Sequence, residues 1–314
     1  MSFLSNVLAK FDPTVAIDKA LTPPASWYAS NEFFELDRRA VFAHAWQPVA
    51  RRDQLASPGQ VVSGCFAGEP YVVTRDENGL HALSNVCRHK AMVVANTSDA
   101  NESLVCPYHG WKYDLDGTLR KAPKVAGIDD FDRNTMSLPR LGLCQWGPWI
   151  FVNPDPNAPP LGEELVELEQ RLEATRWSDL RFVSSKSWVI ECNWKVYIDN
   201  YLDGGYHIPH MHPSLDAQLS MDSYRTDLFH NYSIQSSDAG AAGDSRTEVD
   251  SEQRIGDGAV YAWLFPNFMI NRYGPCMDSN WVRPMGTDRC EVVYEFYFAD
   301  AESKNEEFIA QSIE

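Results

Sequence analysis

Two short Cys/His pairs constrain this chain of 314 residues more than any other feature. Cys87 and His89 have one residue between them, and Cys106 and His109 have two. Sixteen residues separate the two pairs. Tight pairing makes four unrelated core residues a poor explanation, so the spacing predicts two loops that hold one metal centre together.

The mixed composition of each pair indicates the type of centre. A Rieske [2Fe–2S] cluster takes two thiolates on one iron and two imidazoles on the other. Two loops that each supply one Cys and one His meet that requirement. The alternative is a structural Cys2His2 zinc site, but zinc fingers usually pair Cys with Cys and His with His. We therefore expect the cluster ligands to be Cys87, His89, Cys106 and His109.

A second metal site is indicated in residues 193–212, where an aromatic-rich helical segment leads to His207 and His212. A mononuclear Fe(II) that activates O₂ commonly binds two histidines and one carboxylate, which leaves positions open for O₂ and substrate. On a continuous helix these two histidines would be splayed about 140° apart. Pro209 disfavours helix at the residue before it, so we expect His207 to end the helix and His212 to reach back from a loop.

His210 is the alternative partner for His207, because residues three apart share one helical face. Pro209 interrupts that helix, so we place His210 behind the ligands or in the pocket. The remaining alternative is that all three are ordinary surface or capping histidines. The cluster motif in the same chain makes that alternative weaker.

The pattern of helix and strand signals predicts an α+β chain with three parts. Residues 1–40 form a helical lead-in, with Ser30 or Asn31 placed to cap a helix over residues 31–46. Residues 41–154 form a small β domain, with strands near 60–62, 71–74, 80–84 and 149–152 and a hairpin turn at 77–79. Residues 155–160, rich in Pro, Asp and Asn, form a linker.

The third part, residues 155–314, is predicted to be the catalytic domain. It has a helical pattern over 161–177, a strand over 181–190 and two long strand-like runs over 259–272 and 280–298. The last residues, 301–314, have the pattern of a helix that has just begun.

Bulk composition excludes some partners. Because 44 acidic residues outweigh 27 basic ones, the net charge is −17, and nucleic acid or an anionic membrane surface is not expected as a partner. No stretch has the ~20 apolar residues of a spanning helix, and we find no secretory leader. Seven cysteines, an odd number, suit a reducing compartment, so we expect a cytoplasmic protein.

The sequence around the two Cys/His pairs resembles that of the Rieske non-haem iron oxygenases. The second pair stands in CPYHGW (residues 106–111), and YD (113–114) and DG (116–117) also match the Rieske domain of that family. DNYLDGGYH (199–207), MDSY (221–224) and the run over residues 259–281 are similar to the choline monooxygenase branch. The resemblance implies a small β Rieske domain and a larger catalytic domain, whose antiparallel sheet is flanked by helices in a helix-grip arrangement.

The resemblance also implies roles for residues at the second site. The iron-binding pattern of the family, H-x4-H, matches His207 and His212. Its members usually carry an acidic residue three positions before the first histidine, which bridges to a Rieske histidine of a neighbouring subunit. This chain has Gly204 there, so Asp203 is expected to take that role, with Asp199 as the fallback. The third iron ligand should be an aspartate in a late helix, and we expect it beyond Glu314. The late carboxylates are interpreted as solvated helix charges: Asp300, Glu302, Glu306, Glu307 and Glu314.

The activity implied is oxidation of choline to betaine aldehyde hydrate, a step towards glycine betaine. Electrons would come from NAD(P)H through a reductase or ferredoxin, pass to the cluster, and reach Fe(II) through His89 or His109 and Asp203 across a homotrimer boundary. Aromatic faces bind quaternary ammonium groups, and alternation sends Tyr261, Trp263 and Phe265 to one face of a strand. We take the substrate-binding candidates to be Trp263, Phe265 and Trp281, with Phe268 and Tyr273 nearby, although any one of them is more simply a core aromatic.

Two rival functions stay open. The same iron centres could oxidise another N-methyl compound or an aromatic ring. Alternatively, the chain could be a Rieske electron carrier or binding protein with an inactive second domain. His207 and His212 distinguish the classes, because a pure carrier has no need of them.

Overall fold

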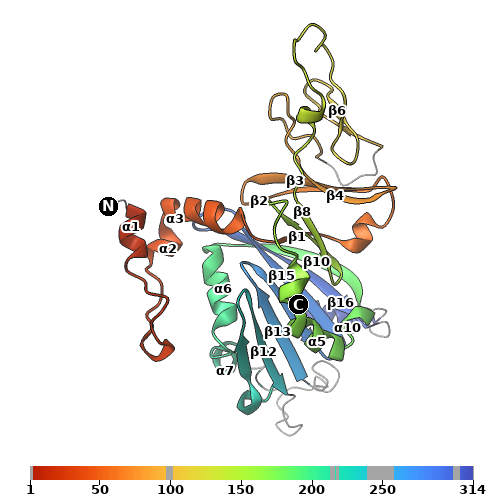
Figure 1. The fold of residues 1–314 in the computed structure, drawn as a ribbon. Coiled ribbons are helices and arrows are strands. Elements are labelled where there is room, and N and C mark those ends of the chain that lie inside the picture. Colours follow the sequence, from red (N-terminus) through yellow and green to blue (C-terminus); the bar gives the residue numbers. More distant parts are fainter. Residues whose placement is uncertain are drawn as a thin grey trace. The chain divides into compact units, whose positions relative to one another are not determined.

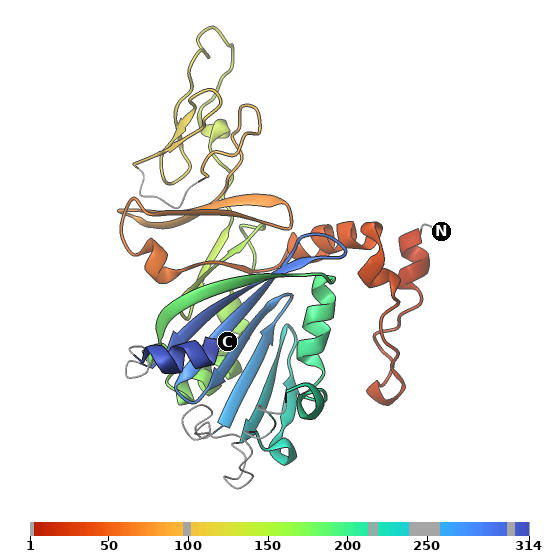
Figure 2. The same ribbon diagram turned by 180° about the vertical axis from the view of Figure 1, so that it is seen from behind.

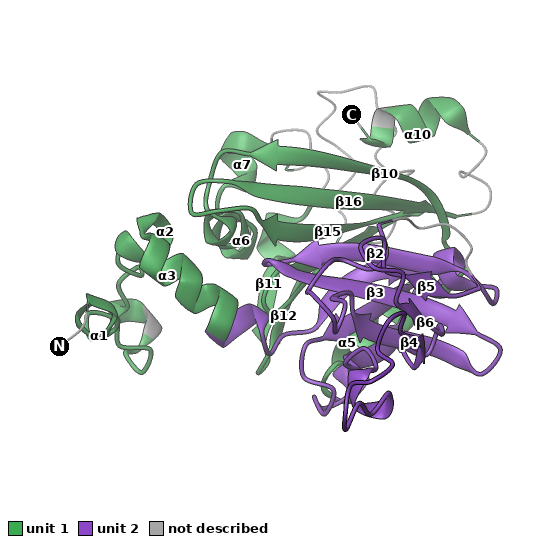
Figure 3. Ribbon diagram, turned by 90° about the horizontal axis from the view of Figure 1, so that it is seen from above, with its two compact units in different colours: residues 1–39, 164–314 green, residues 40–163 purple. Residues whose placement is uncertain are grey.

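The computed structural model describes residues 3–96, 102–212, 216, 219–238, 258–299 and 305–313. The chain divides into two compact units, Ala40–Glu163 and a second unit made of Met1–Arg39 with Glu164–Glu314 (Figure 3). The first is built mainly of strands and the second of helices and strands, which is the α+β class predicted from the sequence.

In the described part of Ala40–Glu163, three small antiparallel sheets carry the loops of the first motif. Their orders are β1-β9-β8, β2-β3-β4 and β5-β6-β7. The strands are β1 (Gln47–Arg51), β2 (Val61–Phe66), β3 (Glu69–Asp76), β4 (Gly79–Ser84), β5 (Leu104–Val105), β6 (Lys112–Tyr113), β7 (Leu119–Lys121), β8 (Gly142–Trp146) and β9 (Trp149–Asn153).

The predicted hairpin between β3 and β4 is confirmed. The side chain of Asp76 accepts hydrogen bonds from the backbone N–H groups of Asn78 and Gly79, at 2.8 and 2.9 Å. Gly79 has φ +140°, a conformation that suits glycine. This turn fixes the register that delivers β4, and therefore Cys87 shortly after it, to the core of the unit.

Within the described residues, the other unit is organised on one seven-stranded antiparallel sheet (Figure 1). Its order is β10-β16-β15-β14-β13-β12-β11. The strands are β10 (Arg181–Ile190), β11 (Arg225–Leu228), β12 (Tyr232–Asp238), β13 (Gly258–Leu264), β14 (Phe268–Tyr273), β15 (Cys276–Pro284) and β16 (Cys290–Phe298). The strand predicted over residues 181–190 is confirmed.

The two long runs expected near the end of the chain are hairpins, which corrects the prediction of single strands. The first run folds back between β13 and β14, around Phe265 and Pro266. The second turns between β15 and β16. Proline has no N–H to give to a ladder, so a run that contains Pro266 breaks there.

Helices cover both faces of the large sheet. The helix α5 (Val166–Ala174) lies over one face in Figure 1, where the Arg272 side chain donates to the Thr175 carbonyl at the end of α5. On the other face lie α6 (Trp194–Leu202), α7 (Ile208–Met211) and α10 (Glu306–Ile313), the last seen in front of the sheet in Figure 2. The helix α4 (Leu161–Glu164) precedes α5. The helix expected at the end of the chain is therefore present as α10.

The N-terminal residues form α1 (Phe3–Leu8), α2 (Ser26–Ala29) and α3 (Asn31–Leu36), and then a π-helical stretch, Asp37–Phe42. Ser30 caps α3, because its side chain accepts a 3.0 Å hydrogen bond from Phe33 N. The sequence set residues 1–40 apart, but the structure groups residues 1–39 with the large sheet. Long-range contacts that no local pattern reveals join them to it; in one of these, Lys195 on α6 forms an ion pair with buried Asp37.

Candidate metal centres

The first Cys/His motif lies in two loops, one after β4 and one after β5. Each loop turns on itself immediately after its cysteine, because Ala91 N donates to the Cys87 carbonyl and Gly110 N donates to the Cys106 carbonyl, both at 3.0 Å. Gly110 has φ +70°, which a side chain would disfavour. Each of these two turns contains the histidine of its pair, so the histidine lies close to its cysteine.

The structure brings the four predicted residues together as a thiol pair and an imidazole pair. Cys87 and Cys106 are buried, at 3 % and 2 % exposure, in the core of the unit. His89 and His109 are exposed, and their ring centroids are 4.5 Å apart. An inner pair of thiols and an outer pair of imidazoles is the donor arrangement that a [2Fe–2S] cluster of the Rieske type requires.

The electrostatics of these residues fit a metal centre. Burial raises the pKa of the Cys106 thiol; backbone N–H bonds from Tyr108 and His109 lower it, and the Cys87 thiol beside it raises it. Loss of hydration and the neighbouring His109 lower the pKa of His89, which favours the neutral ligand form. A metal that binds here therefore displaces thiol protons and meets neutral imidazoles.

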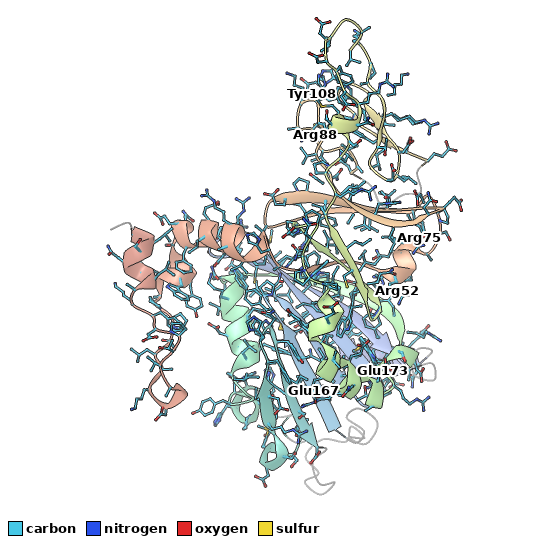
Figure 4. All side chains as sticks on the ribbon, in the orientation of Figure 1. Arg52, Arg75, Arg88, Tyr108, Glu167 and Glu173 are labelled. Atoms are coloured by element: carbon cyan, nitrogen blue, oxygen red, sulfur yellow. The ribbon has the colours of Figure 1, made fainter. Side chains whose placement is uncertain are left out.

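Aromatic side chains support the site. The Trp111 ring stacks on His89 at 5.0 Å, and the Tyr108 ring lies 3.9 Å from His109. The Tyr113 hydroxyl lies 3.3 Å from the Cys87 sulfur and accepts a hydrogen bond from Arg88 N. In Figure 4, Tyr108 and Arg88 are labelled at the loop end of this unit.

The second site begins where α6 ends. Asn193 caps the start of α6, accepting a hydrogen bond from Lys195 N. After Leu202 the chain turns through Gly204 and Gly205, at φ +71° and +80°. Because both conformations suit glycine, the two glycines end the helix at Leu202, well before Pro209, which was expected to end it.

Pro209 therefore has a different role from the predicted one. It stands in the first turn of α7, where a missing N–H costs nothing. His207 precedes the first residue of α7 and His212 follows its last residue. The prediction that Pro209 ends the long helix at His207 is wrong, although the expected pairing of His207 with His212 does occur.

The side chains of His207 and His212 lie next to each other. Their ring centroids are 5.1 Å apart and their planes are inclined at 74°. The Nδ1 atom of His207 lies 2.6 Å from the Asp203 carboxylate, which leaves Nε2 for a metal. Asp203 also accepts a hydrogen bond from Gly205 N, so the same carboxylate fixes both the turn and the imidazole.

The other candidates near this pair lie differently. His210 is exposed on α7. Asp199 accepts a 2.6 Å hydrogen bond from the Tyr28 hydroxyl, so it links α6 to the N-terminal helices. Glu306 and Glu307 are exposed at the start of α10. Three of the late carboxylates, Asp300, Glu302 and Glu314, lie outside the described residues. The third iron ligand, expected beyond Glu314, also lies outside them.

Within the described residues, no three His, Cys, Asp or Glu side chains gather around a single metal position. For the first site this is consistent with a cluster in which each iron takes two protein ligands. For the second site it leaves two imidazoles, and the third ligand stays a prediction.

The sheet face beneath α6 is rich in tyrosine. The Tyr201 hydroxyl donates to Oδ1 of Asn271 on β14 at 2.8 Å, and the Tyr201 carbonyl accepts from Gln235 on β12. Tyr224, Tyr261 and Tyr273 pack in one cluster with Ile208, the residue after His207. The His207 segment and the aromatic face therefore belong to one local structure.

The predicted substrate-binding residues divide between the two faces. Strand register places Trp263 on the α6 face, in the same row as Asn280. Phe265 follows the end of β13 and is 43 % exposed. Trp281 and Phe268 pair with each other on the opposite face. The structure does not bring Trp281 to the side that carries the histidines.

Sequence reasoning did not identify Tyr201 or the polar residues that it meets. A usable signal was present, because Asp278 and Asn280 are polar residues two positions apart in a run that is expected to be a strand, and Asn271 is a polar residue in the run before it. A buried polar row of this kind indicates either a hydrogen-bond network or a binding face.

Known proteins resemble the chain in both units. Residues 45–132 match the Rieske [2Fe-2S] domain, and residues 177–313 match the ring hydroxylating alpha subunit (catalytic domain). Choline monooxygenase of Arabidopsis thaliana is 39 % identical over 331 residues, covering 100 % of this chain and 76 % of that protein.

Two solved structures share the fold. A quaternary ammonium Rieske monooxygenase, described with carnitine oxidation and inter-subunit electron transfer, has a TM-score of 0.80 at 27 % identity, covering 93 % of this chain and 80 % of that one. Naphthalene 1,2-dioxygenase from Rhodococcus sp. has a TM-score of 0.80 at 24 % identity, over 98 % and 80 % of the two chains, which supports the fold alone.

Among the described helices, none has the length and apolar character needed to cross a bilayer. The family matches extend over both candidate centres, so the cofactors are a Rieske [2Fe–2S] cluster and a mononuclear iron. The chain belongs to the Rieske non-haem iron oxygenases, in the branch that contains the choline monooxygenases.

Proposed function

We propose that this oxygenase oxidises a small quaternary ammonium substrate, and that the substrate is choline, converted to betaine aldehyde hydrate. The observation that carries the proposal is the pairing of His207 and His212 beside a tyrosine-rich face. Ring faces attract quaternary ammonium groups through their quadrupole. The similarity to choline monooxygenase over the whole chain supports the same substrate class.

The residues of the chain would hold two iron centres. When bound, these centres supply stored electrons and activation of O₂. Cys87, Cys106, His89 and His109 would hold the cluster, and His207 and His212 would hold the mononuclear iron. Asp203 keeps the His207 ring oriented. The net reaction takes choline, O₂, two electrons and two protons to betaine aldehyde hydrate and water.

Rieske oxygenases take their electrons from a reductase or ferredoxin. We propose that this chain works as a homotrimer in which Asp203 meets His89 or His109 of a neighbouring copy. Two features support this: the Asp203 side chain is 30 % exposed although it contacts His207, and both histidines of the cluster motif are exposed. A related monooxygenase structure is described with inter-subunit electron transfer.

Mixed trimers test the subunit arrangement. Cys87→Ser removes a cluster ligand and His212→Ala removes an iron ligand, so each variant alone should be inactive. If electrons cross between subunits, co-assembly of the two variants restores part of the activity. If each subunit works alone, the mixture stays as inactive as its components.

Single turnover tests the substrate. Protein reduced without oxygen is mixed with O₂ and one of three compounds: choline, carnitine or naphthalene. The proposal expects betaine aldehyde hydrate from choline. Oxidation of carnitine alone would favour another N-methyl substrate, oxidation of naphthalene would favour an arene oxygenase, and reduced cluster with no product from any substrate would favour an electron carrier.

We also propose a cytoplasmic location for this chain. The plant relative is named as chloroplastic. Cell fractionation followed by immunoblotting distinguishes the two compartments.

A further inference from the structure

Two cysteines outside the cluster motif lie next to each other in the unit that carries His207 and His212. The Sγ atoms of Cys192 and Cys290 are 4.0 Å apart, and both cysteines are free thiols. The two residues are 98 positions apart in the sequence, so the fold and not the local chain brings their sulfurs into contact. Neither sulfur has a part in the proposed oxygenase reaction.

Backbone pairing and a side-chain contact hold the two cysteines in place. Ile190, the last residue of β10, pairs with Cys290, the first residue of β16. The Cys192 N–H donates to the Ile190 carbonyl at 2.9 Å, so the chain turns tightly after β10. On the other side of Cys192, Nδ2 of Asn193 donates to the Thr287 carbonyl, in the turn between β15 and β16, at 2.9 Å. Contacts on both sides of Cys192 therefore keep its sulfur beside that of Cys290.

The two thiols differ in exposure, which gives them different chemistry. Cys290 is 0 % exposed, and burial, together with the neighbouring Cys192 thiol, raises the pKa of Cys290, so this sulfur keeps its proton. Cys192 is half-buried, so it is the sulfur that an oxidant from solvent reaches first. A second thiol already in contact has a high effective concentration towards whatever forms on Cys192.

We propose that Cys192 and Cys290 form a reversible oxidation site whose oxidant is hydrogen peroxide. The Cys192 sulfur takes one oxygen of the peroxide as a hydroxyl, the O–O bond breaks, and the other oxygen leaves as water with the thiol proton. The Cys290 sulfur then attacks the sulfenic acid, the S–O bond breaks, and a second water leaves with the Cys290 proton. The two thiols lose two electrons, and the sulfurs close from contact distance to about 2.05 Å.

This site goes beyond the proposed function, because it needs neither the substrate nor the mononuclear iron. A half-buried thiol without a partner passes from sulfenic to sulfinic acid, which thiols do not reverse. A partner thiol in contact converts the sulfenic acid to a disulfide, which cellular thiols reduce again. Cys192 immediately precedes Asn193, the cap of α6, so the pair protects the junction at which the helix leading to His207 begins.

Peptide mapping of the oxidised holoenzyme tests the site. The full chain is treated with a small excess of hydrogen peroxide, the remaining thiols are alkylated, and a tryptic digest is analysed by mass spectrometry without reduction. Trypsin places the two cysteines in separate peptides, residues 187–195 and 290–304, so a bond between them joins two fragments of known mass. The matched control is Cys144→Ser, since Cys144 is also half-buried but lies in the other unit.

In the wild type and in Cys144→Ser, peroxide should link the two peptides, and dithiothreitol should separate them again. In Cys290→Ala, dimedone should label Cys192 as a sulfenic acid, and longer exposure should convert it to sulfinic acid. In Cys192→Ser, Cys290 should stay reduced because it is fully buried.

Two results in the wild type would overturn the proposal, and neither depends on how well a variant folds. One is a Cys192 that stays reduced in peroxide while Cys144 is oxidised. The other is a Cys192 that becomes sulfinic acid with no linked peptide, since that would show that the Cys290 sulfur does not reach it.

Discussion

The Nδ1 atom of His207 lies 2.6 Å from Oδ2 of Asp203, across the turn that ends α6. The carboxylate therefore fixes which imidazole nitrogen faces a metal and makes that nitrogen more basic. Both effects strengthen iron binding without direct contact between Asp203 and the iron.

Asp203→Asn should lower iron affinity at the second site by about 10- to 100-fold, because the imidazole loses its carboxylate partner. The absorbance of the [2Fe–2S] cluster should not change. Competition with a chelator, followed by iron analysis, measures the affinity. Asp199→Asn is the matched control, since it makes the same change on α6 at a residue that bonds Tyr28 instead. Equal losses in both variants would contradict the role given to Asp203.

The two glycines after α6 provide a matched pair of substitutions. A Cβ on Gly205 would lie 2.9 Å from the Tyr224 ring, whereas a Cβ on Gly204 would lie 3.7 Å from its nearest neighbour, Thr226 Oγ1. Both have positive φ, so alanine at either position costs about 1 kcal/mol of strain.

Gly205→Ala should cost roughly 1–3 kcal/mol more than Gly204→Ala, because it also displaces the Tyr224 ring. Iron retention should fall with it, since the displaced turn carries His207. Urea unfolding and iron analysis of the two variants test this. Equal stability of the two variants would show that Tyr224 moves aside freely.

The Tyr113 hydroxyl lies 3.3 Å from the Cys87 sulfur, so we expect it to affect the reduction potential of the cluster. A hydrogen bond to a ligand sulfur stabilises the reduced, more negative cluster. Tyr113→Phe should therefore lower the reduction potential by roughly 40 mV, the equivalent of a hydrogen bond worth about 1 kcal/mol in a one-electron couple. Redox titration followed by absorbance measures it, and an unchanged potential would remove this role from Tyr113.

Alkaline pH should destabilise the catalytic unit through Tyr201. Burial is the largest cause of its raised pKa, so the folded state keeps this proton at a pH where the unfolded chain has lost it. The contribution of Tyr201 to stability is complete below about pH 10 and falls by about 1.4 kcal/mol per pH unit above it.

The variant Tyr201→Phe should make the fall in unfolding free energy between pH 10 and 11 less steep. Urea unfolding across that range measures the slope. Tyr206→Phe is the control, because Tyr206 is 82 % exposed. A slope in Tyr201→Phe as steep as in the control would contradict the account.

Most of the features that the sequence predicted correctly depend on residues that are close together in the chain. Cys87 and His89 are close in the chain, and so are Cys106 and His109, so their pairing could be anticipated without knowing the fold. The cap at Ser30 and the turn at Gly79 are also local, and the structure has both. The family resemblance supplied the sheet and the two cofactors.

Long-range contacts account for what could not be predicted. The ion pair between Asp37 and Lys195 joins residues that are far apart in sequence, so local patterns set residues 1–40 apart as a separate lead-in. Strand register, which alternation alone does not fix across a hairpin, sends Trp281 to the face opposite Trp263. Pro209 was misjudged because a proline both breaks a helix and starts one.

Iron content tests the central claim, that His207 and His212 bind a mononuclear iron. Protein purified without oxygen should contain about three irons per chain, two in the cluster and one at the histidine pair. His212→Ala should contain about two, with unchanged cluster absorbance, and His210→Ala should keep all three. A wild-type protein that holds only the two cluster irons, or a third iron lost in His210→Ala but kept in His212→Ala, would contradict the account.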